Sequence, residues 1–237
     1  MSLLGVLTVA RPDCLAVAER LSSGVTGGAA DLRFKLHAGS PAPPGVIALP
    51  EAELDPPEPF RGPLFAAVET FALATRARPL AGKPGVGQAA EGCEPDEPAL
   101  GLVVPARRLD ADGRAAGASA DAEGLILVLD HVNLALRSPL SGRWPPGRPR
   151  IFPSMSGIYQ PSGVRLEPDP GIYSRLVVAG VADAEHLSAF ELAETRRAGL
   201  TTVSDRLVAP VIIAAYYGLA VAAVCVPQAT PGPIHHE

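Results

Sequence analysis

The sequence has few of the residues from which a nucleic-acid site, a disulfide framework or a metal centre is built. Only 19% of its 237 residues are charged and 5% are aromatic, the formal net charge is −5, and no long run of Lys or Arg occurs. A nucleic-acid partner is therefore not expected, because such proteins carry clustered basic residues. The three cysteines, Cys14, Cys93 and Cys225, are odd in number and far apart. They form no CxxC pair and no metal-ligand spacing, so we expect reduced thiols, no metal and no cofactor.

The first residues, MSLLGVLTVARPD, also lack the parts of a signal peptide. They contain neither a basic segment nor a small-residue cleavage site after an apolar core. Together with the expected reduced cysteines, this predicts a cytoplasmic protein. With 47% hydrophobic residues, the chain is long enough for one sizeable α/β domain.

The most apolar stretch, residues 199–226, carries one compact polar cluster at 204–206. About 20 apolar residues can cross a bilayer, so a membrane helix is one reading of this stretch. Pro210 and Gly218 interrupt the run, however, and no Lys or Arg flanks its far end as an anchor. We therefore expect no membrane span.

The same stretch predicts a short strand, a polar loop, a helix over 208–217 and a strand over 219–226 that is buried on both faces. The loop consists of Ser204, Asp205 and Arg206. Such a unit places its loop at the C-terminal edge of a parallel sheet, where open α/β folds bind ligands.

Elsewhere, strands are expected over 3–9, 31–37, 46–49, 99–104, 124–129 and 172–179, and helices from Asp13 to about 21, over 63–78 and over 187–198. Polar stretches rich in Gly and Pro predict mobile loops over 79–98 and 107–122, and 228–237 is expected to be a tail. Ser188 and Glu191 have the spacing of a helix capping box, so Glu191 is expected to be structural. The alternation of strands and helices predicts one α/β domain over 1–237, with a central mixed sheet flanked by helices.

Four motifs follow one another in the second half of the chain. They are GLILVLDHVNL (124–134), FPSMSGIY (152–159), GIYSRLVVAG (171–180), and SAFELAETRRAG (188–199) followed by LTTVSDRLVAPVIIAAYYGLAVA (200–222). Their order and spacing resemble the trimeric purine nucleoside phosphorylases and methylthioadenosine phosphorylases of the nucleoside phosphorylase superfamily. The resemblance covers slightly more than half of the chain. It implies a nucleoside phosphorylase-like fold, a homotrimer, and cleavage of a nucleoside N-glycosidic bond by phosphate.

The sequence departs from this family where the family binds phosphate and purine. The Gly-Ser-Gly turn after the first strand and the Arg-x-His pair are missing, and Arg206 stands where the family has a serine. Arg206 with Ser204, and the adjacent Arg107 and Arg108, are therefore the anion-binding candidates; the alternative is that these arginines form ordinary surface pairs. The purine-binding carboxylate is absent in an ungapped alignment. Gln228 stands near the family's purine-binding Asn.

Asp205 and His186 are the acid/base candidates, because they are the titratable groups nearest the inferred sheet edge. His131 follows a strand and either bonds a loop backbone or faces the pocket. Phe152 and Tyr159 lie in a segment that, in the family, contributes to the neighbouring subunit's pocket. This favours a homotrimer; the alternative is ordinary aromatic packing.

Two main function classes stay open at this stage. The motifs of the family's fold are present, and charged residues replace the family's residues in the site. This combination favours an enzyme that acts on a nucleoside-like or other small heterocyclic substrate, with phosphate as a candidate co-substrate. The loss of the Gly turn, the Arg-x-His pair, the carboxylate and the family's C-terminal helix favours instead an inactive homologue that binds a small ligand or serves as a scaffold subunit. A third reading is an unrelated α/β ligand-binding domain.

Overall fold

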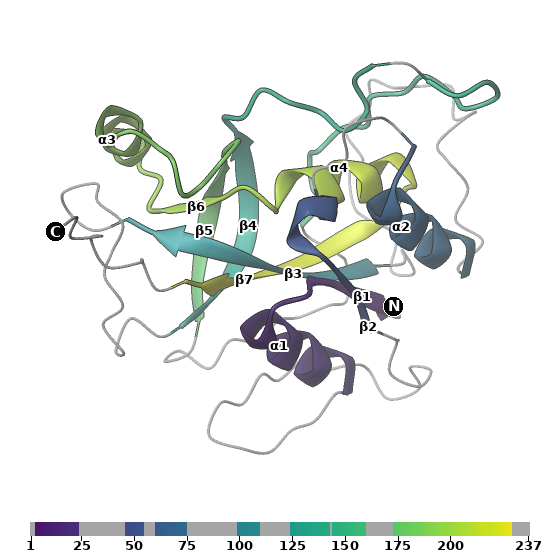
Figure 1. Ribbon diagram of the computed structural model, residues 1–237, viewed down its shortest axis with the longest axis horizontal. Coiled ribbons are helices and arrows are strands. Elements are labelled where there is room, and N and C mark those ends of the chain that lie inside the picture. Colours follow the sequence, from purple (N-terminus) through teal and green to yellow (C-terminus); the bar gives the residue numbers. More distant parts are fainter. Residues whose placement is uncertain are drawn as a thin grey trace, which may run out of the picture.

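The computed structural model describes residues 3–23, 46–54, 60–74, 99–109, 124–142, 144–159 and 173–228. In chain order the elements are β1 (Leu3–Val9), α1 (Pro12–Ser23), β2 (Val46–Leu49), the 3-10 helix η1 (Glu51–Leu54), α2 (Pro63–Ala74), β3 (Ala99–Arg108), β4 (Leu125–Asn133), β5 (Tyr173–Gly180), α3 (Ala189–Arg197), β6 (Thr202–Ser204), α4 (Val208–Tyr216) and β7 (Ala220–Pro227) (Figure 1).

One mixed sheet joins the strands of the described part in the order β2-β1-β3-β6-β5-β4-β7, and β7 also pairs with β3. The strands β3, β6, β5, β4 and β7 therefore close into a ring. Within it β7 runs parallel to β3, whereas β6 is antiparallel to β3 and β4 is antiparallel to β7. The predicted single α/β domain with a mixed sheet flanked by helices is confirmed.

β3 is the strand at which the ring meets the rest of the sheet. On one edge β3 pairs with β7 from Ala99 to Ala106. On the other edge it pairs with β1 as far as Val103, and then with β6 at Arg107 and Arg108. β1 and β6 thus separate along 104–106, and this change of neighbour leaves a crevice of the kind in which α/β folds bind ligands.

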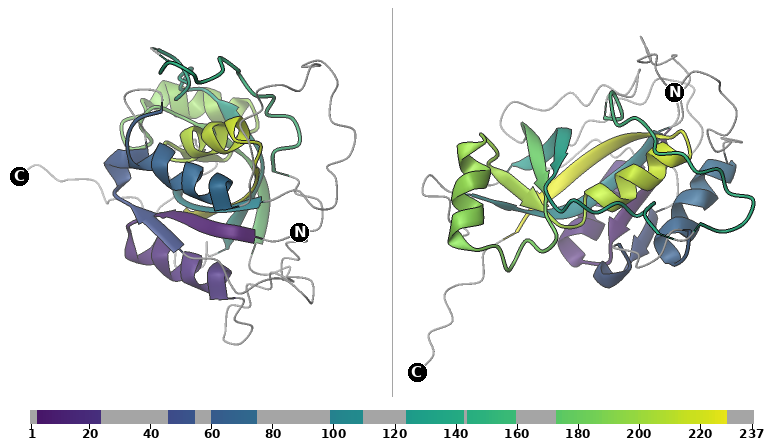
Figure 2. Two further views of the ribbon diagram at one scale, coloured as in Figure 1. Left: turned by 90° about the vertical axis from the view of Figure 1, so that its right-hand side faces the viewer. Right: turned by 90° about the horizontal axis from the view of Figure 1, so that it is seen from above.

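Helices cover both faces of the sheet. α1 packs on β1 and β3 from one face, and α2 packs with α4 on the other (Figures 1 and 2). The approach of α2 is close: a Cβ at Gly5 would lie 1.8 Å from the Phe71 ring. A glycine is therefore required at this point of β1. α3 lies apart from α1 and α2, over a smaller cluster of buried residues, Leu109, Ala179, Val181, Ala184, Leu200 and Val203.

The long apolar stretch forms the middle of the domain. After β6 and the polar loop it forms α4, with Pro210 in the first turn, where a missing N–H costs little. Gly218, at φ 72°, ends this segment, and β7 follows with its residues almost all buried. Residues 207–227 are uncharged because α4 and β7 are buried in the core, so the membrane-helix reading is wrong. In the part of the chain described here, no helix has the length and apolar character needed to span a membrane.

Most predicted elements agree with the structure, and two strands are longer than expected. The strands over 3–9 and 46–49 are confirmed. Arg107 and Arg108 belong to β3 and not to a loop, because pairing with β6 and β7 extends this strand. Likewise 130–133 belong to β4, which continues past an irregularity between Val128 and Asp130. The strand expected over 31–37, the loop over 79–98 and most of the loop over 107–122 lie outside the described residues.

Candidate functional site

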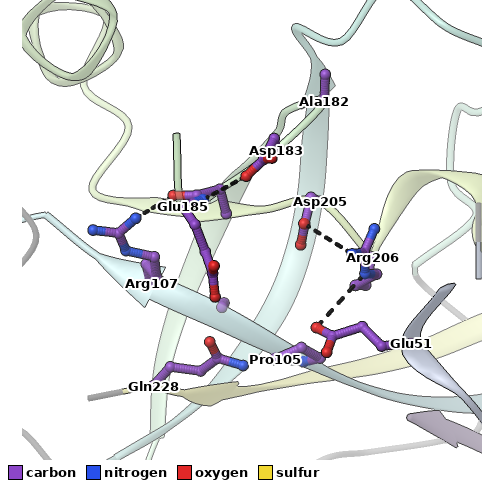
Figure 3. Close-up of a pocket in the computed structure, with 11 residues that line it drawn as sticks. Glu51, Pro105, Arg107, Ala182, Asp183, Glu185, Asp205, Arg206 and Gln228 are labelled. Atoms are coloured by element: carbon purple, nitrogen blue, oxygen red, sulfur yellow. Dashed lines mark hydrogen bonds and ion pairs between the residues drawn. The ribbon is translucent and has the colours of Figure 1, made fainter. Parts of the chain in front are cut away.

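A cavity of about 180 Å³ opens at the crevice beside β3 (Figure 3). Its lining is strongly polar and comes from segments that are far apart in the sequence. We call it the sheet-edge pocket; it is lined by Glu51, Pro105, Ala106, Arg107, Ala182, Asp183, Ala184, Glu185, Asp205, Arg206 and Gln228.

Most of these residues lie just after the end of a strand. Glu51 follows β2, Gln228 follows β7, and the segment 182–185 follows β5. Asp205 and Arg206 directly follow β6. Because loops after strands tolerate polar side chains and the strands are rigid, this arrangement fixes functional groups on a stable scaffold.

Ser204 holds the loop after β6 and does not line the pocket. Its side chain is fully buried, and its hydroxyl donates to the Pro105 carbonyl oxygen at 2.8 Å. The Ser204 hydroxyl oxygen in turn accepts from the backbone N–H of Arg206 at 3.3 Å. Ser204 thus ties β6 to β3 within the gap and sets where Asp205 and Arg206 begin.

Asp205 is the carboxyl group of the pocket whose acidity is most affected by burial. Its side chain is 13% exposed. Burial raises the pKa of Asp205 above its ordinary value, because the charged form is desolvated. The Arg206 guanidinium and hydrogen bonds from backbone amides act in the opposite direction and do not cancel this effect. More of Asp205 is therefore protonated near neutral pH than an exposed Asp would be.

Two carboxylates bracket the Arg206 guanidinium. Its Nη2 lies 3.4 Å from Asp205 Oδ2, and its Nε lies 3.7 Å from Glu51 Oε1 (Figure 3). The Nε atom is buried and has no hydrogen-bond partner among the described residues. Arg206 therefore serves first as a counter-charge between η1 and the loop after β6.

Arg107 and Arg108 point to different places, because neighbouring residues of a strand face opposite sides. Arg107 lines the pocket, and its Nη1 donates to the Ala184 carbonyl oxygen, which ties β3 to the loop after β5. Arg108 lies away from the pocket. It donates to the Gly124 carbonyl oxygen at 2.9 Å and to Ser174 Oγ at 3.3 Å.

The loop between β5 and α3 is organised by Asp183. Its Oδ1 accepts from the backbone N–H of Glu185 at 2.9 Å and of His186 at 3.1 Å, and its Oδ2 lies 2.8 Å from His186 Nδ1. The hydrogen bond with His186, more than any other contact, holds the pKa of Asp183 below its ordinary value. The His186 side chain is 79% exposed and does not line the pocket, although it borders the segment that does.

His131 and Tyr159 form a separate pair. The Tyr159 hydroxyl lies 2.7 Å from His131 Nδ1, and burial lowers the pKa of His131 and raises that of Tyr159. Tyr159 lies near the start of β7, since Val221 donates to the Ile158 carbonyl oxygen, whereas Gln228 follows the end of β7. Phe152 is 63% exposed and is also absent from the pocket lining.

The pocket thus brings together four of the residues singled out from the sequence, Asp205, Arg206, Arg107 and Gln228. Three carboxylates were missed: Glu51, Asp183 and Glu185. Each closely follows a predicted strand, which is a partial signal, but the sequence does not show that these strands end at one pocket. Within the described residues, no group of three or more His, Cys, Asp or Glu side chains is arranged to hold a metal ion.

No protein-family model matches the chain, and no curated protein sequence is similar to it. Among solved structures, it is similar to the Schistosoma mansoni purine nucleoside phosphorylase complexed with a monocyclic inhibitor, with 16% identity and a TM-score of 0.41 over 56% of this chain and 53% of that chain. It is also similar to isoform 2 of the enzyme from that organism, in complex with cytosine and ribose-1-phosphate, with 20% identity and a TM-score of 0.40 over 54% and 46% of the two chains. The match thus spans about half the length of either structure, and at such identities the likeness concerns the fold alone.

Proposed function

We propose that this protein binds a nucleoside-like or other small heterocyclic substrate in the sheet-edge pocket and cleaves its N-glycosidic bond. The observation that carries the proposal is Asp205, a largely buried carboxyl group with a raised pKa on the wall of a polar cavity. The order of the four sequence motifs supports the same reaction class.

The chemistry asks for a proton at the leaving heterocycle. As the bond from the sugar to the ring nitrogen breaks, negative charge builds on the heterocycle, and a positioned acid neutralises it. An acid works best when its pKa lies near the operating pH, and burial moves Asp205 in that direction. Arg206, 3.4 Å away, stabilises the carboxylate that remains after proton transfer.

The test is turnover of a nucleoside panel (inosine, adenosine, guanosine, uridine and 5′-methylthioadenosine) by the wild type and by Asp205→Asn. The variant keeps the shape of the side chain but loses the acid, so kcat is expected to fall roughly 10²–10⁴-fold. Asp13→Asn is the matched control, because Asp13 lies on α1 and pairs with Arg11 outside the pocket. Equal turnover by Asp205→Asn and the wild type would falsify the role of Asp205.

A second candidate is a ligand-binding or scaffold protein without turnover. It is favoured by the cavity, which at about 180 Å³ is smaller than the roughly 300 Å³ at which drug-sized ligand sites begin. A free base or a small heterocycle would fit such a site better than a whole nucleoside. Thermal-shift measurements with adenine, uracil and inosine, together with the turnover assay, separate the two candidates. The ligand-binding candidate predicts that a free base stabilises the protein and that no nucleoside is cleaved.

A further inference from the structure

We infer that water, and not phosphate, accepts the glycosyl group in the sheet-edge pocket, with Glu185 as the general base that activates it. The inference rests on the proposed function and adds to it the acceptor and a second catalytic residue. It comes from the balance of charge in the pocket and from the position of Glu185.

The charge of the lining opposes a phosphate ion. Three carboxylates, those of Glu51, Asp183 and Glu185, and the Asp205 carboxyl group line the cavity, against the guanidiniums of Arg107 and Arg206. A dianion placed among them would meet like charges from several sides, which strongly disfavours binding.

Protein acceptors already engage both guanidiniums. Arg107 donates to the Ala184 carbonyl oxygen, and Arg206 lies between Asp205 and Glu51. The Nε atoms of the two arginines are buried, so a ligand in the cavity does not reach them. Among the described residues, the pocket therefore offers no cation that is free of protein acceptors and could clamp phosphate.

Glu185 is placed to act on a water molecule in the cavity. Figure 3 shows its side chain reaching into the pocket between Arg107 and Gln228, and Asp205 points toward the same space from the loop after β6. The backbone N–H of Glu185 donates to Asp183 Oδ1 at 2.9 Å, and three residues later Ser188 caps α3. The segment that carries Glu185 is therefore held at both ends. Among the described residues, Glu185 has no ion-pair partner that would neutralise its charge.

The step balances with water as the only co-reactant. The water oxygen forms a bond to the anomeric carbon, and its proton passes to the Glu185 carboxylate. The bond from the anomeric carbon to the ring nitrogen breaks, its electron pair goes to that nitrogen, and Asp205 supplies the proton. Two carboxyl groups, one acting as acid and one as base, are the usual requirement for hydrolysis of a glycosidic bond. Exchange with solvent then returns the proton from Glu185 and reprotonates Asp205.

The experiment follows cleavage of the same nucleoside panel in phosphate-free buffer and with inorganic phosphate added, and identifies the sugar product. We expect free sugar without phosphate, and no rate increase when phosphate is added. Cleavage that needs phosphate and releases a sugar phosphate would overturn the inference and leave the proposed function standing. No cleavage and no nucleoside binding in calorimetry would overturn both, whereas binding without cleavage would overturn the hydrolytic step and favour the scaffold candidate.

The role of Glu185 is tested in Glu185→Gln and Glu185→Ala, with Glu194→Gln as the control because Glu194 pairs with Arg197 on α3, outside the pocket. A lost base is expected to lower kcat about 10²–10⁴-fold with little change in KM. Added formate, a small carboxylate that can enter the space left in Glu185→Ala, is expected to restore part of the rate. Unchanged kcat in both variants, or a loss that formate does not restore although circular dichroism shows a folded protein, overturns the assignment of Glu185.

Discussion

At the scale of single residues, the acidity of Asp205 results from two opposing effects. Burial raises its pKa and Arg206 lowers it. Removing the guanidinium in Arg206→Gln is therefore expected to raise the pKa of Asp205 further, and to extend the protonated form to higher pH. The measurement is a titration of the Asp205 carboxyl carbon by NMR in the wild type and in the variant.

The raised pKa of Asp205 also determines how the stability of the folded protein changes with pH. The folded protein holds the Asp205 proton more tightly than the unfolded chain does, so stability falls as pH rises through the folded-state pKa. In Arg206→Gln this loss is expected to occur at higher pH and to be larger. Arg197→Gln is the control, since Arg197 lies on α3 and pairs with Glu194. An unchanged or lowered pKa of Asp205 in Arg206→Gln would contradict the prediction.

The residue scale also shows which parts of the site a sequence can indicate. Asp205 was identifiable because it interrupts an apolar stretch just where a strand ends. Glu51 and Glu185 were missed because nothing local shows that the ends of β2 and β5 meet the end of β6. His131 was grouped with the pocket because it lies in the β4 motif. The antiparallel pairing of β4 with β7 instead carries it toward the start of β7.

At the scale of elements, the capping box of α3 is the best-defined local signal in the chain. The Ser188 hydroxyl accepts from the Glu191 N–H at 3.2 Å, and Glu191 Oε2 accepts from the Ser188 N–H at 2.8 Å. Ser188→Ala is expected to destabilise the protein by about 1 kcal/mol, because the first turn of α3 loses its side-chain acceptor. Urea denaturation measures this loss. The control, Ser141→Ala at an exposed turn, is expected to stay within about 0.5 kcal/mol of the wild type.

The effect of Ser188→Ala should also depend on pH. Hydrogen bonds from Ser188 hold the pKa of Glu191 below its ordinary value. The stability that these bonds provide is present above the unfolded-state pKa and is lost as pH falls through the folded-state pKa. The difference in unfolding free energy between the wild type and Ser188→Ala is therefore expected to narrow in acid. A constant difference would show that the bond from the Ser188 hydroxyl to the Glu191 carboxylate adds no stability.

At the scale of the whole molecule, the closure of the ring is what the sequence could not predict. The spacing of apolar residues and the capping residues predicted the bounds of most helices and strands, because these signals lie within a few residues of each element. The partner of each strand depends on residues far apart in the sequence. One edge of β3, for example, pairs first with β1 and then with β6. That exchange creates the sheet-edge pocket, so the pocket as a whole was not predictable even though several of its residues were.

The homotrimer expected from the sequence also belongs to the scale of the whole molecule. Four of the exposed large apolar side chains lie on β4 and the turn after it, Leu129, Val132, Leu134 and Leu136, and exposed Val177 lies beside them on β5. Clustered exposed apolar residues mark interaction surfaces more often than scattered ones do. We propose that they contribute to the homotrimer expected from the sequence.

Light scattering coupled to size-exclusion chromatography tests this association. The wild type is expected at three times the chain mass, and the double variant Leu134→Ser with Leu136→Ser at a lower mass, because it removes the most exposed side chain of the cluster, Leu136 at 90%. Phe190→Ser is the control, since Phe190 is also a large apolar residue, 74% exposed, but lies on α3 and not on β4. Its mass should equal that of the wild type. A monomeric wild type would contradict the trimer, and a trimer that survives the double variant would place the interface on another face.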